Sequence, residues 1–168
     1  AGGMFFNKPK AKYNIVDDLD SDVFNLFQVV MNQKEELEKA FYMMPIHSDL
    51  LEYWKKNQET DPIKKALRFL FLSNLTFMGT GDTVKFGASG GYQHIKKSFK
   101  KELKDSCNLL FDVQFNNCHF KKFINSISLD DRGNKKESEQ TFIYCDPPYL
   151  NTTDNYSNSF TESDSLEL

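Results

Sequence analysis

The chain has 168 residues, 39% of them hydrophobic, and a formal net charge of −3. It can therefore bury a core of its own, and no apolar run approaches the roughly 20 residues that a membrane-spanning helix needs. Three cysteines without metal-ligand spacing argue against a disulfide framework or a metal site. We expect a cytoplasmic domain with reduced thiols, no bound metal and no membrane contact.

The beginning of the chain combines glycines with acidic residues. Gly2-Gly3 precedes a short predicted helix over 4–9, and a glycine pair at this place lets the backbone approach a ligand closely. A predicted strand over 13–17 follows and is continued by Asp18, so that a carboxylate could bind the hydroxyl groups of a ribose. A glycine helix start and a solvated acidic turn would explain the same residues without a ligand.

Helical patterns dominate the next part. The spacing of apolar residues predicts a long amphipathic helix over 21–43 and a short helix capped by Ser48. Asp61-Pro62 is typical of a third helix start, with aspartate as the cap and proline in the first turn. A glycine-rich stretch over 78–91 indicates a loop or hairpin, and a basic helix is predicted over about 92–105.

This helical part interrupts an alternation of strands and helices. The sequence indicates a strand over 109–115, a helix over 120–127 and a polar linker over 130–140. We therefore predict an α/β domain made of residues 1–43 and 107–168, with residues 44–106 inserted as a mostly helical subdomain. An insertion that only buttresses the sheet is an equally good interpretation.

The most informative residues lie near the end, where Asp146-Pro147-Pro148-Tyr149 follows the apolar run Thr141–Cys145. The run predicts a buried strand, and two prolines cannot continue a sheet, so an acid and a tyrosine would sit on a stiff turn at the carboxyl end of that strand. A carboxylate and a proline carbonyl can both accept hydrogen bonds from an exocyclic amine, which favours the form with a localised, nucleophilic lone pair. A plain turn after a strand remains the alternative.

Five segments together resemble the Dam-like family of DNA adenine-N6 methyltransferases: residues 1–9, 15–22, 68–79, 117–120 and 142–149. Their order also resembles the family's, with the cofactor loop first, target-recognition helices in the middle and the catalytic turn late. The resemblance implies a Rossmann-like, S-adenosylmethionine-dependent methyltransferase fold with an inserted helical DNA-recognition subdomain. The family's strands before the glycine loop and after the catalytic turn are not found in this sequence.

The resemblance also implies a cofactor site. Gly2 and Gly3 would line the methionine end of S-adenosylmethionine, and Asp18, with Asp17 as the second choice, would bind its ribose. His119-Phe120 would lie at the cofactor adenine. Family members usually carry an acid where this chain has His119, so the hydrogen bonds at that position would differ.

The acceptor implied by the resemblance is an adenine flipped out of double-stranded DNA. Asp146 and the carbonyl of Pro147 would hold its amino group, Pro148 would add rigidity, and Tyr149 would stack on the base. DNA phosphates could meet a lysine stripe on one face of the basic helix, made of Lys97, Lys100, Lys101 and Lys104. The candidate DNA-binding residues are Lys85 of the glycine-rich stretch and Lys97, Lys100 and Lys101 of this stripe. A solvated helix face is the competing interpretation for each of these lysines.

The expected function is thus site-specific adenine methylation in restriction-modification or in phage or host DNA protection, with a cognate restriction endonuclease as a candidate partner. Two alternatives stay open on the sequence. The catalytic turn would also serve a methyltransferase acting on cytosine N4 or on an RNA adenine. A non-catalytic, nucleic-acid-binding remnant of such an enzyme would carry the same residues.

Overall fold

The computed structural model describes residues 3–76, 83–84, 92–127, 141–147 and 160–167. Within them the chain is a mixture of helices and strands, and the strands form a two-stranded parallel sheet. The elements, in chain order, are α1 (Gly3–Asn7), β1 (Asn14–Asp17), α2 (Ser21–Asn32), α3 (Lys34–Met43), α4 (Ser48–Lys56), α5 (Pro62–Leu70), the π-helix η1 (Phe71–Leu75), α6 (Tyr92–Leu110), β2 (Val113–Asn116), α7 (Phe120–Ser126) and α9 (Glu162–Glu167).

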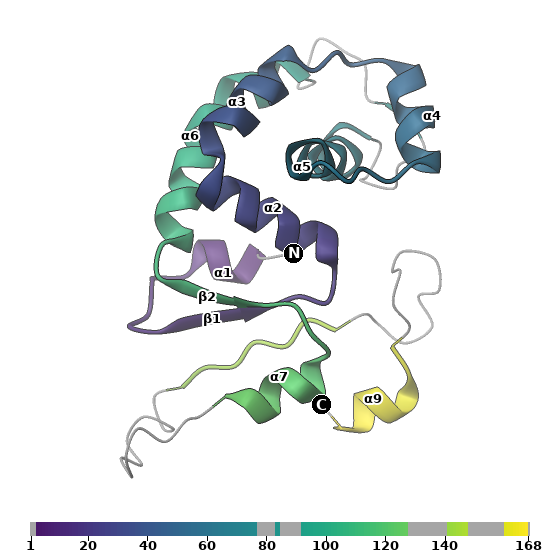
Figure 1. Ribbon diagram of the computed structural model, residues 1–168. Helices are drawn as coiled ribbons and strands as arrows, with labels where there is room; N and C mark the ends of the chain where they lie inside the picture. The colour runs from purple at the N-terminus through teal and green to yellow at the C-terminus, as the bar shows by residue number, and fades with distance from the viewer. Residues whose placement is uncertain (1–2, 77–82, 85–91, 128–140, 148–159, 168) are drawn as a thin grey trace.

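The sheet divides the helices into two groups. Helices α1, α2 and α6 lie on one side of β1 and β2, whereas α7 and α9 lie on the other (Figure 1). The two strands pair in register from Asn14 with Val113 to Asp17 with Asn116. Because the strands are parallel, their carboxyl ends, and the residues that follow them, lie at one edge of the molecule.

The core lies between the helices. Ring contacts join distant segments: Phe41 of α3 stacks on Phe99 of α6 with centroids 3.9 Å apart, and Trp54 of α4 meets Phe71 of η1 edge-on at 5.1 Å. Helices of the predicted insert therefore share one apolar cluster with α2 and α3 in the described part of the chain. Helix α6 also runs across the predicted boundary at residue 106. The division into domains stays a prediction.

Two predicted helix boundaries are wrong. The helix expected over 21–43 is broken at Gln33, whose backbone (φ −139°, ψ 40°) is not helical and whose N–H donates to the Val29 carbonyl. The cap of α4 is His47 rather than Ser48, because the imidazole Nδ1 accepts the Asp49 N–H at 3.0 Å. The helix start at Asp61-Pro62 is confirmed, since the Asp61 carboxylate accepts the Lys64 N–H at 2.9 Å.

The boundary between α6 and β2 also differs from the prediction of a strand over 109–115. Leu110 is buried with 1% of its surface exposed, so the helix continues until this apolar residue has joined the core. Asp112 then takes a left-handed backbone conformation (φ 64°), which ends the helix, and β2 begins one residue later.

The predicted buried strand over 141–145 is wrong. These residues form no strand, and Phe142, Ile143 and Tyr144 are 71%, 51% and 54% exposed. Cys145 is exposed as well. An apolar run is buried only if a neighbouring strand accepts it, and in the described residues β1 and β2 pair only with each other. The segment is extended without being part of the sheet.

Removing the Asp61 cap gives a first prediction. Asp61→Ala leaves the Lys64 N–H at the start of α5 without its acceptor, which should cost about 1 kcal/mol of unfolding free energy. For a chain of this size we expect a decrease in melting temperature of roughly 2–4 °C, measured by circular dichroism. Asp61→Asn keeps the acceptor oxygen and should melt within about 1 °C of the unaltered protein. Equal melting temperatures for Asp61→Ala and the unaltered protein would contradict the assigned cap.

Candidate active site

The carboxyl ends of β1 and β2 are linked by hydrogen bonds between the residues that follow them. The Asp18 N–H donates to the Asn116 carbonyl at 3.4 Å, and the Asn117 side-chain amide donates to the Asp18 carbonyl at 2.6 Å. The Cys118 N–H donates to the Asp17 carboxylate at 3.1 Å. This edge thus joins two parts of the chain that are about a hundred residues apart, and it fixes both predicted ribose-binding acids.

Asp18 is half-buried and tied to the start of α2. Its carboxylate accepts the Asp20 N–H at 2.9 Å, and the Asp20 carboxylate in turn caps α2 by accepting the Asp22 N–H at 2.8 Å. Burial raises the pKa of Asp18 above its ordinary value, opposed by the hydrogen bond from Asp20 and reinforced by the Asp20 charge. A partly desolvated carboxylate with spare lone pairs is a suitable acceptor for sugar hydroxyl groups.

The loop that carries Asp18 is anchored to the helical part. The Asp22 carboxylate lies 3.1 Å from the Lys65 ammonium and 3.1 Å from the Arg68 guanidinium, both on α5. Arg68 also donates to the Trp54 carbonyl at 2.9 Å. The start of α2 is therefore held by α5 and α4, which fixes where the preceding acidic loop can lie.

His119 and Phe120 lie at the start of α7, shortly after the carboxyl end of β2. The His119 Nδ1 accepts the Lys121 N–H at 3.4 Å and so caps α7. The rings of His119 and Phe120 are 4.6 Å apart and inclined by 33°. Burial is the main cause that raises the pKa of the neighbouring Cys118 thiol, and the charge of the Asp17 carboxylate adds to it. The thiol therefore stays protonated at neutral pH.

The predicted glycine pair lies at the start of α1. Gly3 is the first residue of this helix, and a Cβ at that position would meet no protein atom within 4 Å. The space beside Gly3 is therefore open to an incoming group. Gly2 lies outside the described residues.

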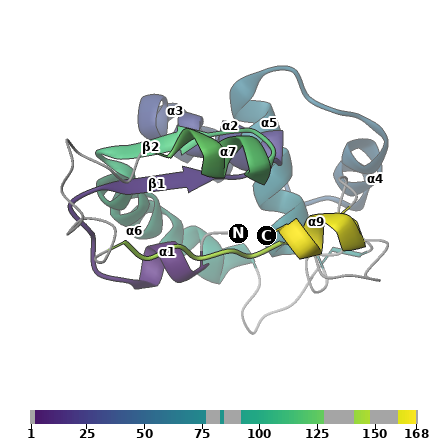
Figure 2. The ribbon, with the colours of Figure 1, turned by 90° about the horizontal axis from the view of Figure 1, so that it is seen from below.

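The predicted catalytic turn is described only in its first half. Asp146 is exposed and Pro147 is half-buried, while Pro148 and Tyr149 lie outside the described residues. Segment 141–147 runs in the same direction as β1 and β2 and ends on the side of the molecule where the carboxyl ends of the strands lie (Figures 1 and 2). No hydrogen bond joins Asp146 to another of the predicted site residues in the described part of the chain.

The predicted lysine stripe lies on the exposed face of α6. Lys100 pairs with Glu38 of α3 at 3.2 Å and Lys101 with Asp105 at 3.9 Å. Lys97 and Lys104 are exposed on the same helix, whereas Lys85 lies outside the described residues.

Helix α9 (Glu162–Glu167) is not among the elements that we predicted from the sequence. Thr161 and Asp164 cap this helix reciprocally, because the Thr161 N–H and hydroxyl donate to the Asp164 carboxylate and the Asp164 N–H donates back to the hydroxyl. The Thr-x-x-Asp spacing resembles a capping box and could have revealed the helix. Asp164 also faces α7, where it lies 3.9 Å from His119 Nε2 and 3.4 Å from the Lys121 ammonium.

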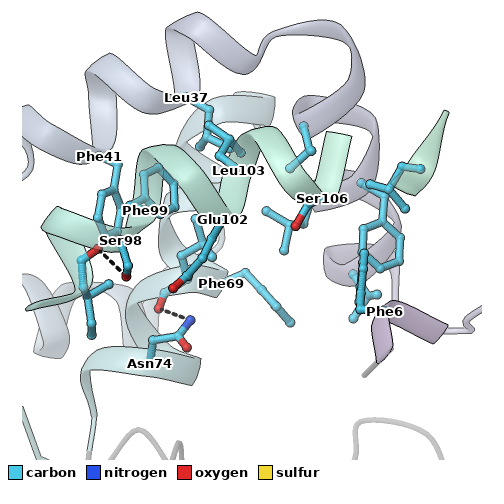
Figure 3. Close-up of a pocket in the computed structure, with 17 residues that line it drawn as sticks. Phe6, Leu37, Phe41, Phe69, Asn74, Ser98, Phe99, Glu102, Leu103 and Ser106 are labelled. Carbon is cyan, nitrogen blue, oxygen red and sulfur yellow. Dashed lines mark hydrogen bonds between the residues drawn. The ribbon is translucent and has the colours of Figure 1, made fainter. Parts of the chain in front are cut away.

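A cavity of about 430 Å³ lies elsewhere, between α2, α3, α5 and α6 (Figure 3). Its walls are mainly apolar, with Leu37, Phe41 and Phe99 among the side chains that point into it. Asn74 and Glu102 are among the few polar residues at its margin. A cavity of this kind does not suit a ligand that carries an amino acid and a ribose, so we place the candidate site at the strand ends.

Within the described residues, no group of three or more His, Cys, Asp or Glu side chains could hold a metal ion. The same residues contain no helix that is both long and apolar enough to cross a membrane.

Comparison with known proteins identifies the family. No curated protein matches this sequence significantly. The model of the family described as D12 class N6 adenine-specific DNA methyltransferase matches residues 1–168 and confirms the resemblance to Dam-like adenine methyltransferases. Enzymes of this family use S-adenosylmethionine as methyl donor and DNA as substrate. The chain therefore belongs to the D12 class of N6 adenine-specific DNA methyltransferases.

Proposed function

We propose that this adenine-N6 DNA methyltransferase binds S-adenosylmethionine at the carboxyl ends of β1 and β2 and receives a flipped adenine at Asp146-Pro147-Pro148-Tyr149. The observation that carries the proposal is the pairing of Asp17 with Asn116, which brings the two aspartates and His119-Phe120 to one edge. In a Rossmann-like, doubly wound sheet, ligands bind at this edge of the strands.

The residues at this edge fit the cofactor. Open space beside Gly3 leaves room for the methionine portion, the half-buried Asp18 carboxylate accepts hydrogen bonds from ribose hydroxyl groups, and the rings of His119 and Phe120 offer faces to a base. When bound, S-adenosylmethionine supplies an electrophilic methyl group on its sulfonium sulfur. The chain's own residues orient that group and exclude water from it.

The target amine needs activation, because its lone pair is delocalised into the adenine ring. The Asp146 carboxylate and the Pro147 carbonyl accept its two hydrogens, which localises the lone pair and stabilises the positive charge that develops on nitrogen. Tyr149 stacks on the base. Unstacking adenine from the duplex costs a few kcal/mol, which stacking and phosphate contacts offset.

Residues 44–106 form the target-recognition region in this proposal, with the α6 lysines contacting phosphate groups. Lys100 and Lys101 are engaged by acidic side chains, so Lys97 and Lys104 are the better candidates for a direct phosphate contact. We assign the activity to restriction-modification or to protection of phage or host DNA in the cytoplasm. In the first case, the partner would be a cognate endonuclease.

The lysines give a second prediction. Lys97→Ala with Lys104→Ala removes two positive charges that face the phosphates, so the slope of log K for DNA against log salt should become shallower by about 0.9 for each phosphate that is no longer neutralised. Fluorescence anisotropy of labelled duplex DNA over a salt series measures this slope. The control is Lys39→Ala on α3, an exposed lysine outside the proposed target-recognition region. Equal slopes for the α6 variant and the control would exclude α6 from the interface.

The proposed function is tested by product analysis. Duplex DNA is incubated with the protein and with S-adenosylmethionine labelled in its methyl group, and the nucleosides are then separated. We expect label in N6-methyladenine. Label in N4-methylcytosine, or label only with RNA, would favour the other amine acceptors, and unlabelled DNA would indicate a remnant. Once the methylated position is known, 2-aminopurine can be placed there. Its fluorescence should increase when the protein binds if the base is flipped.

A further inference from the structure

We propose that Asp164 of α9 is a positioning residue for cofactor binding, which acts by fixing the orientation of His119 and, through it, the neighbouring ring of Phe120. The inference rests on the proposed function, because it takes His119 and Phe120 as the residues beside the cofactor base. It adds a residue that follows the catalytic turn in sequence and lies outside all segments of the family resemblance.

The imidazole of His119 has a polar neighbour at each of its nitrogens. Its Nδ1 accepts the Lys121 N–H, so in the neutral ring the hydrogen must be on Nε2. Nε2 lies 3.9 Å from the Asp164 carboxylate, which is too far for a hydrogen bond but close enough for an electrostatic interaction. The ring is therefore aligned between the start of α7 and a carboxylate brought in by α9.

Asp164 is itself held firmly. Its side chain is only 14% exposed, and its two oxygens have separate partners. Oδ2 accepts hydrogen bonds from Thr161, at 3.0 Å from the backbone N–H and 2.7 Å from the hydroxyl, while Oδ1 faces His119 and Lys121. The bonds from the Thr161 hydroxyl and N–H, together with the Lys121 charge, lower the pKa of Asp164 to about 2, so the carboxylate is ionised at neutral pH.

Further contacts hold α9 against α7. The ring of Phe160, two residues before the start of α9, lies 6.2 Å from the ring of Phe120. The Lys121 ammonium pairs with both Asp164 and Glu167, which links α9 to α7, and the two helices are neighbours in Figure 1. The contacts thus form a chain: α9 packs against α7, Asp164 lies beside His119, and the ring of His119 lies beside that of Phe120.

Asp164→Asn tests the inference, because the amide keeps an oxygen for Thr161 but turns an NH2 group towards His119 and Lys121. We expect the Kd for S-adenosylmethionine, measured by isothermal titration, to rise about three- to tenfold. At saturating cofactor, kcat and the KM for DNA should stay within about twofold of the unaltered protein. Asp164→Glu, which retains the charge, should recover most of the affinity.

Two matched controls separate positioning from simple docking of α9. Glu162→Gln removes an exposed charge in the first turn of α9 without touching Asp164 or His119, and Glu167→Gln removes the other partner of Lys121. Both should bind S-adenosylmethionine within about twofold of the unaltered protein. In a His119→Gln background, Asp164→Asn should have almost no further effect, since its path through the imidazole is gone.

The imidazole nitrogen resonances of His119 give a readout that does not depend on affinity. They should report the Nε2–H tautomer in the unaltered protein and shift in Asp164→Asn. Unchanged resonances, wild-type affinity of Asp164→Asn, or an equal loss in both controls would overturn the inference. If the unaltered protein did not bind S-adenosylmethionine at all, the proposed site would fail as well, and this result is distinguishable from the others.

Discussion

Asp146→Ala is expected to reduce kcat for DNA methylation by at least about 10²- to 10³-fold, which is the usual effect of removing one preorganised group that stabilises charge in a transition state. Alanine removes the carboxylate that accepts a hydrogen from the adenine amine. Asp146 is exposed, and its side chain forms no hydrogen bond or ion pair with the described residues. The melting temperature should therefore change little. Affinity for S-adenosylmethionine should be nearly unchanged. Single-turnover methylation with labelled cofactor measures the chemical step directly.

Two further variants define the role of Asp146. Asp146→Asn keeps one acceptor oxygen and loses the charge, so its rate should fall between those of the aspartate and the alanine. The control is Glu36→Ala, which removes an exposed carboxylate on α3, away from the catalytic turn, and should leave the rate unchanged. Full activity in Asp146→Ala would remove this residue from the mechanism, and the candidate acceptor site would then have to be placed elsewhere.

Asp18→Asn is expected to weaken binding of S-adenosylmethionine by roughly 10- to 100-fold. Hydrogen bonds to a charged group contribute about 1.5–3 kcal/mol, and each 1.4 kcal/mol is a factor of about ten in Kd. Isothermal titration measures the loss. Asp17→Asn, at the second choice for this role, should have a smaller effect. The opposite order would make Asp17 the ribose-binding acid.

The stability of Asp18→Asn should move in the other direction. Burial raises the folded-state pKa of Asp18 above 3.8, so as the pH falls the folded protein takes up this proton before the unfolded chain does. The ionised carboxylate therefore lowers stability above its folded-state pKa, and this cost disappears at lower pH. At neutral pH Asp18→Asn should melt at the same temperature as the unaltered protein or higher. A lower melting temperature together with weaker binding would mean that Asp18 is structural.

Much of the local structure could be predicted from the sequence, because it depends on neighbouring residues. The start of α5 is set by Asp61-Pro62, and β1 by a short apolar run that ends in acids. The break at Gln33 could not be predicted, since the apolar pattern continues through it and the break depends on how α2 and α3 pack. Whether residues 141–145 form a strand depends on a neighbouring strand that pairs with them. The local sequence pattern contains no information about such a neighbour.

For the candidate site, the sequence could indicate residues but not how they lie relative to one another. The motifs identified Asp17, Asp18, His119 and Phe120, and the structure adds the link between Asp17 and Cys118 that joins them. Asp164 was missed because its relation to His119 is purely tertiary, across 45 residues of sequence. The roles of all these residues stay predictions until the variants are measured.

The most direct test of the proposed site is a titration of isotope-labelled protein with S-adenosylmethionine, followed by amide NMR shifts. We expect saturable binding, with the largest shifts at Gly3, at Asp18 and over 118–120. Shifts concentrated at the apolar cavity, for example at Phe41, Phe99 and Leu103, with none at the strand ends, would contradict the account.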